Sequence, residues 1–222
     1  MLRKASFRTL SLAVLLVLGA IAPAAAQLGA RDAQEWIKTL ERPERVQAQK
    51  VDEVIARLAV KPGQVIADIG AGSGIFSRPL AKAVAPSGKV YAVDIDPALL
   101  DHINQTAKQQ NLGNIQAVLG EFDDPKIPAR DVDLALINDV LHHIEHRAAY
   151  LKALSTYIKP RGRIAIIEMN DQDPNTPHKG QPELLVSRKQ IEQGMSDVGF
   201  KLVQEFPDLF PGTKWFLVYG KK

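Results

Sequence analysis

Short apolar runs alternate with amphipathic segments along most of this chain. Runs of four to six apolar residues between Gly- or Pro-containing turns predict buried strands, whereas apolar positions repeating every three or four residues predict helices. The predicted strands are residues 65–69, 90–93, 115–119, 132–137, 163–168, 201–205 and 215–219. The predicted helices of the same region are residues 75–84, 98–110, 147–158 and 188–198.

The order of these elements predicts the fold. Strands that alternate with helices form a parallel sheet with right-handed crossovers. The last two strands are joined by residues 206–214 without a helix, so they must form an antiparallel hairpin. We therefore expect an α/β protein: a three-layer sandwich around a seven-stranded, mostly parallel sheet that ends in an antiparallel hairpin.

Before the first strand, the pattern predicts an N-terminal helical extension over residues 27–60. Its two helices, 31–40 and 44–59, are separated by Pro43, and Trp36 is the residue expected to anchor the first helix. The main domain is then expected to cover residues 61–222.

The first 26 residues have the features of a secretory signal. Arg3, Lys4 and Arg8 precede an apolar stretch over residues 10–22, and an A-x-A site ends at Ala26. Cleavage near Ala26 is the favoured reading, and an uncleaved anchor is the alternative, although the stretch is short for a membrane span. In either case the positive-inside bias predicts that the remainder is exported, in the periplasm.

Composition narrows the class of partner. The 222 residues are 45% hydrophobic and 24% charged, as in a globular protein. The net charge of +3 comes from the three basic residues of the leader, and the remainder carries 25 basic and 25 acidic side chains. A neutral domain has no general electrostatic footprint for nucleic acid. The absence of cysteine excludes disulfides and a thiol nucleophile.

A glycine-rich turn follows the first predicted strand. Its spacing is Asp68-x-Gly70-x-Gly72-x-Gly74, and the dinucleotide fingerprint G-x-G-x-x-G/A fails because Ile75 takes its last position. A carboxylate beside the turn repels a pyrophosphate and suits a cationic ligand without phosphate. S-adenosylmethionine, with a sulfonium, an ammonium and a ribose, is such a ligand.

Polar residues also follow the next strands. Ligands of such sheets bind beyond the carboxyl ends of the strands, where the strand order reverses. Asp94 is placed to accept hydrogen bonds from ribose hydroxyls, and Ile95 to pack on the adenine. Glu121 is placed to accept from the adenine amino group, Phe122 to border the base, and Asn138 to lie near the methionine end.

These residues resemble the class I S-adenosylmethionine-dependent methyltransferases. The landmarks are residues 68–74, Asp94, residues 120–124, residues 133–138 and the turn at 159–162, within a resemblance that runs from about Gln49 to Tyr219. The resemblance implies a Rossmann-like sheet whose last strand is antiparallel, and methyl transfer to a nucleophilic acceptor. The expected donor-binding residues are Asp68, Gly70, Ala71, Gly72, Gly74, Asp94, Ile95, Glu121, Phe122 and Asn138.

The resemblance fixes no catalytic residue, because much of methyl transfer rests on proximity and orientation. The candidates are Asp139, His142 and His143, with Glu168 bordering the acceptor. A histidine there can deprotonate an acceptor hydroxyl, since it titrates near neutral pH. The alternative is that both histidines pack the loop. His178, in the Pro-rich loop, either contacts an anionic acceptor or is solvated.

Two other functions remain open. His142, Glu145 and His146 match the H-x-x-E-H pattern of a zinc peptidase, although the pattern falls at a predicted loop-to-helix junction. The pocket can also belong to a non-catalytic adenosyl- or nucleoside-binding module. Our expectation is a methyltransferase without a metal that acts on a small-molecule acceptor. We also expect a monomer or homodimer with no stable membrane association after signal cleavage.

Overall fold

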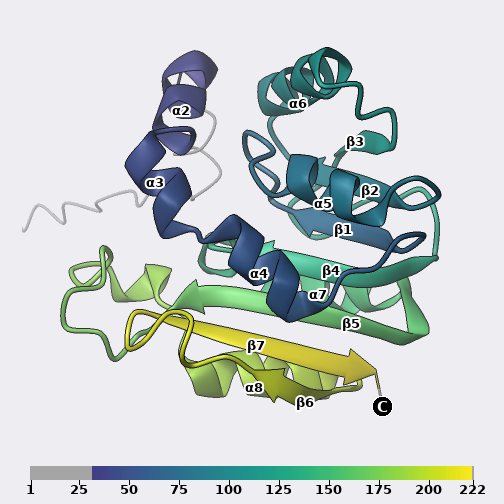
Figure 1. Ribbon diagram of the computed structural model, residues 1–222. Coiled ribbons are helices and arrows are strands. Elements are labelled where there is room, and N and C mark those ends of the chain that lie inside the picture. The colour runs from purple at the N-terminus through teal and green to yellow at the C-terminus, as the bar shows by residue number, and fades with distance from the viewer. Residues whose placement is uncertain (1–31, 222) are drawn as a thin grey trace, which may run out of the picture.

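The computed structural model describes residues 32–221 and contains a seven-stranded sheet in the order β3-β2-β1-β4-β5-β7-β6 (Figure 1). The predicted signal lies outside the described residues. The strands are β1 (Val65–Ile69), β2 (Lys89–Asp94), β3 (Ile115–Leu119), β4 (Val132–Asn138), β5 (Ile158–Met169), β6 (Phe200–Glu205) and β7 (Lys214–Lys221).

Only β7 runs against its neighbours. The pairs β1–β2, β2–β3, β1–β4 and β4–β5 are parallel, whereas β7 is antiparallel to both β5 and β6. This confirms the predicted mostly parallel sheet with a C-terminal hairpin. The strand order reverses between β1 and β4, so a ligand crevice is expected beyond the carboxyl ends of these two strands.

Helices cover both faces of the sheet, as the three-layer prediction requires. Residues of α4 and α5 pack on one face, where α6 also lies, and those of α7 and α8 pack on the other. The helices are α2 (Ala33–Leu40), α3 (Pro43–Ala48), α4 (Val51–Leu58), α5 (Ser77–Val84), α6 (Pro97–Gln109), α7 (Arg147–Ser155) and α8 (Arg188–Asp197). Two short 3₁₀ turns are η1 (Leu141–His143) and η2 (Pro182–Leu184).

Alternate residues of β1 show why the central strands read as continuous apolar runs. Ile66 packs in the cluster that contains Leu80 of α5, whereas Ala67 and Ile69 pack in the cluster that contains Leu154 of α7. A strand that is buried on both faces needs apolar residues at every position. Asp68, at 3% exposure, interrupts this run and therefore calls for a specific role.

The structure corrects the prediction of a single helix over residues 44–59. The helix breaks at Lys50, whose left-handed backbone (φ 47°) separates α3 from α4, and Gln49 is buried. Ile37 is the buried residue of α2, and Trp36, the expected anchor, is half-buried with Arg45 of α3 over its ring. Figure 1 shows α2 and α3 beyond the strand ends rather than against a face of the sheet.

A second correction concerns the turn predicted at residues 159–162. These residues belong to β5 and form an irregularity in its pairing, since Val132 pairs with Ile158 and Leu134 with Arg163. The sheet absorbs the extra residues as a bulge, which keeps the strand continuous. The helix after the glycine turn also begins later than predicted, at Ser77, because the turn itself extends further.

Candidate functional site

The glycine turn passes directly beside the end of β4. Gly70, Gly72 and Gly74 all have positive φ angles, of 64°, 58° and 79°. A Cβ on Gly70 would lie 2.4 Å from Cγ2 of Val140, so a larger residue has no room. Glycine therefore allows both the left-handed turn and its close approach to β4 at the point of strand reversal.

Asp94 ties the end of β2 to this turn. Its Oδ2 accepts from the Gly72 N–H at 2.8 Å, and its Oδ1 accepts from the Asp96 N–H at 3.0 Å. Burial raises the pKa of Asp94, while these backbone hydrogen bonds oppose the shift. The Ala71 N–H donates to the carbonyl of Val93 at 2.9 Å. A carboxylate oxygen accepts more than one hydrogen bond, so Asp94 retains capacity for a hydroxyl ligand.

Asp68 places a second carboxyl group next to the turn. It is 3% exposed, and the Ser77 hydroxyl donates to its Oδ2 at 2.5 Å. Burial raises the pKa of Asp68 to about 6, and the Asp94 charge adds to this, whereas the Ser77 hydrogen bond opposes it. No cation is paired with this group in the described residues. A cationic ligand would therefore relieve an electrostatic cost that the protein itself bears.

The residues after β3 lie at the rim of the site. The Gly120 N–H donates to the Asp94 carbonyl at 2.9 Å, which places the start of this loop beside β2. Glu121, however, forms an ion pair with Lys126 at 3.1 Å, and Phe122 is 55% exposed. The predicted adenine contacts of Glu121 and Phe122 remain predictions. To contact the adenine, Glu121 would have to give up its ion pair with Lys126.

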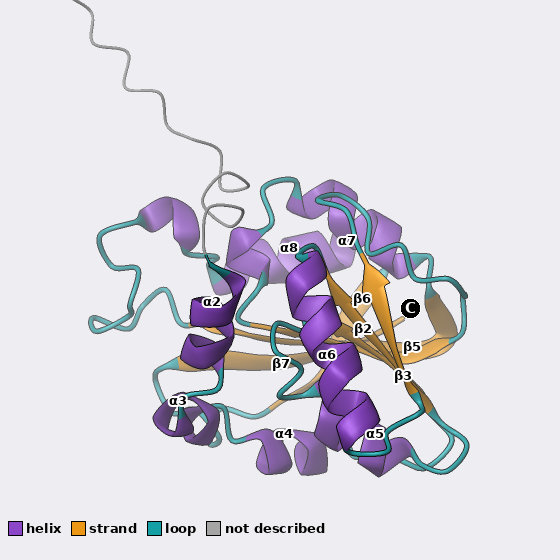
Figure 2. Cartoon of the chain, turned by 90° about the horizontal axis from the view of Figure 1, so that it is seen from above, coloured by secondary structure: helices purple, strands orange, loops and turns teal. Residues whose placement is uncertain are grey.

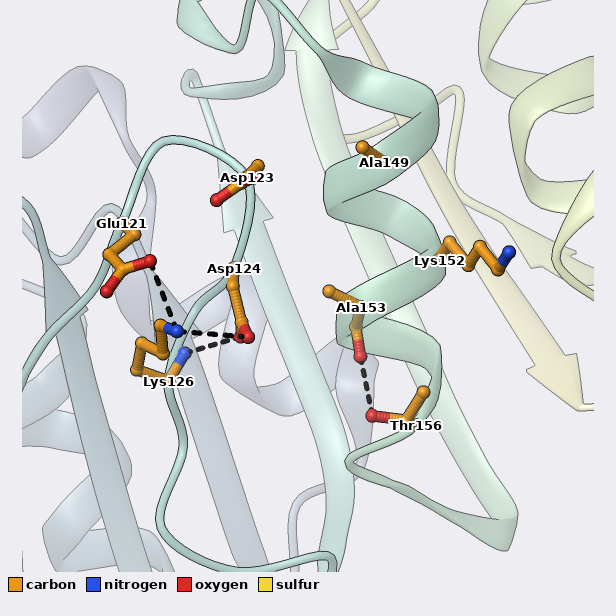
Figure 3. A pocket seen from close by; sticks show the side chains of 8 residues that line it. All are labelled: Glu121, Asp123, Asp124, Lys126, Ala149, Lys152, Ala153 and Thr156. Atoms are coloured by element: carbon orange, nitrogen blue, oxygen red, sulfur yellow. Dashed lines mark hydrogen bonds and ion pairs between the residues drawn. The ribbon is translucent and has the colours of Figure 1, made fainter.

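A hollow of about 470 Å³ lies beside this loop, and Figure 3 shows the side chains that line it. Residues of α7, among them Lys152, form one side together with Thr156, which follows the helix; the other side is Glu121, Asp123, Asp124 and Lys126. The glycine turn contributes nothing to this lining. We therefore place the ligand at the glycine turn and not in this hollow.

The end of β4 carries a network of side chains. Asp139, with a left-handed φ of 52°, accepts through Oδ2 from Lys214 Nζ at 2.5 Å and from Gln49 Nε2 at 3.0 Å. Gln49 Oε1 accepts from Lys214 Nζ at 3.1 Å and from Asn138 Nδ2 at 3.3 Å. Burial alone would raise the pKa of Asp139, but Lys214 and Gln49 outweigh it and hold the pKa below its ordinary value. Asp139 is therefore a weak proton acceptor.

His142 and Glu168 form a buried pair one strand away. His142 Nδ1 lies 2.7 Å from Glu168 Oε1, and the two side chains are 3% and 1% exposed. Glu168 also accepts from the backbone N–H groups of His142 and Met169. An ionised carboxylate only accepts, so Nδ1 donates to Glu168; in the neutral imidazole, Nε2 then carries the free lone pair. The rings of His143 and His178 lie 4.0 and 5.3 Å from that of His142.

The zinc-peptidase alternative fails on local structure. That pattern requires both histidines on one helix face. Here His142 belongs to the 3₁₀ turn η1, Ile144 is extended, and His146 precedes α7. Among residues 32–221, no group of three or more His, Cys, Asp or Glu side chains is arranged to hold a metal ion.

The N-terminal extension closes over the glycine turn, which the sequence did not reveal. Leu40 Cδ1 lies 3.1 Å from where a Cβ on Gly72 would stand. Glu41 Oε1 accepts from Arg78 at 3.1 Å and lies 3.2 Å from His102 Nε2, and Arg78 also donates to a carbonyl of the turn at 2.7 Å. Figure 2 shows α2 and α6 as neighbouring helices. Because these partners are far apart in the chain, no local pattern could predict the contacts.

Most predicted donor-binding residues thus meet at one place, beyond the ends of β1, β2 and β4. Half-buried Ile95 follows β2 directly. The residues gathered there are Asp68, Gly70, Ala71, Gly72, Gly74, Asp94, Ile95 and Asn138. Glu121 and Phe122 lie at the rim, and the predictions missed Gln49, Leu40, Glu41 and Lys214.

Comparisons with known proteins identify relatives of this domain. Residues 66–162 match the model of a methyltransferase domain. A demethylmenaquinone methyltransferase from Geobacillus sp. is 26% identical over 117 residues, which are 53% of this chain and 50% of that protein. A ubiquinone/menaquinone biosynthesis C-methyltransferase from Ectopseudomonas mendocina is 28% identical over 112 residues, 50% of this chain and 44% of that protein. The matches thus span half of these relatives or less.

Two solved structures share the fold. A SAM dependent methyltransferase from Aquifex aeolicus superposes with a TM-score of 0.75 at 22% identity, covering 86% of this chain and 100% of that one. A geranyl diphosphate C-methyltransferase from Streptomyces coelicolor gives a TM-score of 0.70 at 13% identity, covering 91% and 100%. Residues 66–162 therefore carry a methyltransferase domain, and the chain around them has the fold of the class I S-adenosylmethionine-dependent methyltransferases.

Proposed function

We propose that this protein transfers the methyl group of S-adenosylmethionine to a small molecule that carries an ionisable hydroxyl, such as a phenol or a hydroquinone. The observation that carries the donor assignment is the pair of buried carboxylates at the glycine turn, Asp68 and Asp94. Asp94 offers acceptors for the ribose hydroxyls, and Asp68 supplies negative charge for a cationic ligand. A pyrophosphate ligand would instead be repelled by both groups.

We expect the methyl acceptor to bind beside Asn138 and Asp139, at the end of β4. Val140 packs against Gly70, so the end of β4 is adjacent to the donor turn. The predicted position of Asn138 at the methionine end puts the reactive methyl group beside this strand end. An acceptor held there meets the methyl group in line, which supplies much of the rate through proximity and orientation.

His142 is the best placed of the three catalytic candidates. Glu168 fixes its tautomer, as the buried carboxylate does in a hydrolase triad. The acceptor O–H proton would pass to Nε2. The deprotonated acceptor would then use an electron pair, on its oxygen or on an activated ring carbon, to bond the methyl carbon of the donor. The carbon–sulfur bond of the donor breaks as this bond forms. His143, whose ring is adjacent, is the alternative base. Asp139 is the least suited, because its lowered pKa weakens it as a base.

The names of relatives support a small acceptor. Two of them are methyltransferases of quinone biosynthesis, and one structural neighbour is a geranyl diphosphate C-methyltransferase. Between residues 65 and 221 the described chain has no large inserted acceptor domain, and its longest connection is residues 170–187. The contact of His142 with Glu168 is what favours a hydroxyl-bearing member of this class.

The test is a screen with methyl-labelled donor against phenols, hydroquinones, amines and carboxylic acids. We expect label on a phenol or hydroquinone, and loss of most turnover in His142→Gln. Label transferred only to amines or acids would contradict the hydroxyl assignment. Donor binding without transfer to any of these classes would favour the alternative function, a non-catalytic adenosyl-binding module.

We also propose export to the periplasm, on the charge and apolar pattern of residues 1–26. Among residues 32–221, no helix is long and apolar enough to cross a membrane. Cell fractionation combined with the mass of the mature N-terminus tests this proposal. A periplasmic chain that begins near Gln27 is expected, and a cytosolic chain that begins at Met1 would contradict it.

A further inference from the structure

Gln49 is a buried polar residue outside every motif of the donor site. It is 5% exposed and lies at the break between α3 and α4, where Lys50 adopts a left-handed backbone. A non-glycine residue in that conformation costs about 1 kcal/mol or more, so the surrounding structure must maintain it. Lys50 Nζ donates to the Leu209 carbonyl at 2.8 Å, and the break turns Gln49 inward.

Every hydrogen bond of the Gln49 side-chain amide joins it to a residue of the site. Its Nε2 donates to Asp139, and its Oε1 accepts from Asn138 and from Lys214. These partners are 90, 89 and 165 positions away in the sequence. One side chain of the extension therefore joins the ends of β4 and β7, where donor and acceptor are expected to meet.

Two oxygen atoms at this junction have no protein partner in the described residues: Asn138 Oδ1 and Asp139 Oδ1 are buried and accept no hydrogen bond. Buried acceptors of this kind call for a partner. Because Gln49 binds the other polar atom of each side chain, it determines which atom of each faces outward from the network. The network thus presents two oriented acceptors at the end of β4.

We infer that Gln49 is a positioning residue of the reaction, which orients Asn138 and Asp139 toward a ligand that donates N–H or O–H groups and makes closure of the N-terminal extension part of site assembly. The catalytic half of this inference, an effect of Gln49 on methyl transfer, rests on the proposed function. The structural half, the direct coupling of Gln49 to Asp139, stands without any ligand.

The catalytic half is tested with Gln49→Ala beside Gln47→Ala. Gln47 is an exposed glutamine in the last turn of α3, the helix that Gln49 caps, so it controls for the loss of a glutamine at this helix end. Donor affinity is measured by calorimetry, and kcat and KM are measured with an acceptor from the labelled screen. We expect Gln49→Ala to weaken donor affinity or lower kcat by about tenfold, a typical loss for hydrogen bonds with a charged partner. Gln47→Ala should match the wild type, and a Gln49→Ala protein within twofold of wild type would overturn the inference.

The structural half is tested by exchanging the roles of the two side chains. Gln49→Glu sets two carboxylates against each other, and Asp139→Asn removes the charged acceptor. The double variant restores an amide facing a carboxylate. Thermal unfolding without ligand should show the double variant to be more stable than the sum of the single changes predicts. Additive single effects would refute direct coupling. Because this cycle needs no donor, it separates a failure of the inference from a failure of the proposed function.

Discussion

The donor side of the site, at the ends of β1 and β2, and the acceptor side, at the ends of β4, β5 and β7, are built from different contacts. On the donor side, Asp94 binds a backbone N–H 22 positions away and Asp68 binds a hydroxyl 9 positions away. On the acceptor side, the partners are side chains separated by 26 to 165 positions. The first is a local strand–turn unit, whereas the second exists only once the chain has folded.

This difference predicts that the two sides respond differently to substitution. Donor-side changes should affect binding and folding together, because the same atoms shape the turn and hold the ligand. On the acceptor side, changes at the His142–Glu168 pair should lower turnover and leave donor binding unchanged.

Gly70→Ala should have the largest effect, because Gly70 is where the two sides touch. The new Cβ would meet Val140 at 2.4 Å, and its φ is positive. Strain and overpacking together should cost about 4 kcal/mol of unfolding free energy, measured by denaturant titration. Adding Val140→Ala should recover part of this loss. Gly113→Ala, where a Cβ meets nothing within 4 Å, is the control. Equal losses in both alanine variants would disprove the close approach.

Asp68 should make the ligand-free protein less stable as the pH rises. The folded-state pKa of about 6 lies above the unfolded value, so the folded protein holds this proton more tightly. Stability is therefore greatest below pH 4 for this group and falls through pH 6, by about 3 kcal/mol in total. Asp68→Asn should flatten this slope in thermal scans, whereas exposed Asp101→Asn should not.

The same group should make donor affinity depend on pH. A cationic donor binds the ionised form of Asp68, so its affinity should increase between pH 5 and 7 in the wild type but much less in Asp68→Asn. A pH-independent wild-type affinity would contradict the role assigned to Asp68.

On the acceptor side, His142→Gln should lower kcat about 100-fold, the usual contribution of a general base. Glutamine preserves a donor toward Glu168, so the fold and donor affinity should change little. The measurement is steady-state turnover with calorimetric donor titration in parallel. If kcat is retained, the pair is structural; if donor affinity falls equally, the two sides are not separable.

Asp94→Asn should weaken donor binding by about tenfold without abolishing the fold. The amide keeps one acceptor oxygen but presents an N–H group toward a backbone donor. Calorimetry measures the affinity, and circular dichroism checks that the turn survives. Unchanged affinity would remove Asp94 from the ribose assignment.

Glu41→Gln should have the smallest effect. Its partners are partly solvent-exposed, and such ion pairs contribute under about 1 kcal/mol. We expect a small decrease in Tm and faster proteolysis within residues 32–58, with donor affinity changed by no more than about twofold. Glu44→Gln, on the exposed side of α3, is the control, and a large loss of affinity would make the extension part of the donor site itself.

The division between the two sides also explains what the sequence could predict. Strands that are buried on both faces require continuous apolar runs, and the left-handed turn requires three glycines after Asp68. Both patterns are visible in the sequence, so the fold and the donor turn could be predicted from it. Asp94 followed because it ends the next strand. All of these signals are local.

The acceptor side left no local signal. The break at Lys50 is not encoded by Gly or Pro, and it is stabilised by contacts to Leu209, Asp139 and Lys214 that form only in the folded chain. The single helix predicted over residues 44–59 was wrong for this reason. Glu168 was correctly placed at the sheet edge, but its pairing with His142 depends on a 3₁₀ turn that periodicity cannot reveal.

Calorimetric titration of the chain with S-adenosylmethionine tests the central claim most directly. We expect saturable binding at one site, stronger at pH 7 than at pH 5 and weakened by Asp94→Asn. The absence of binding at millimolar donor, in a protein shown to be folded by circular dichroism, would contradict it.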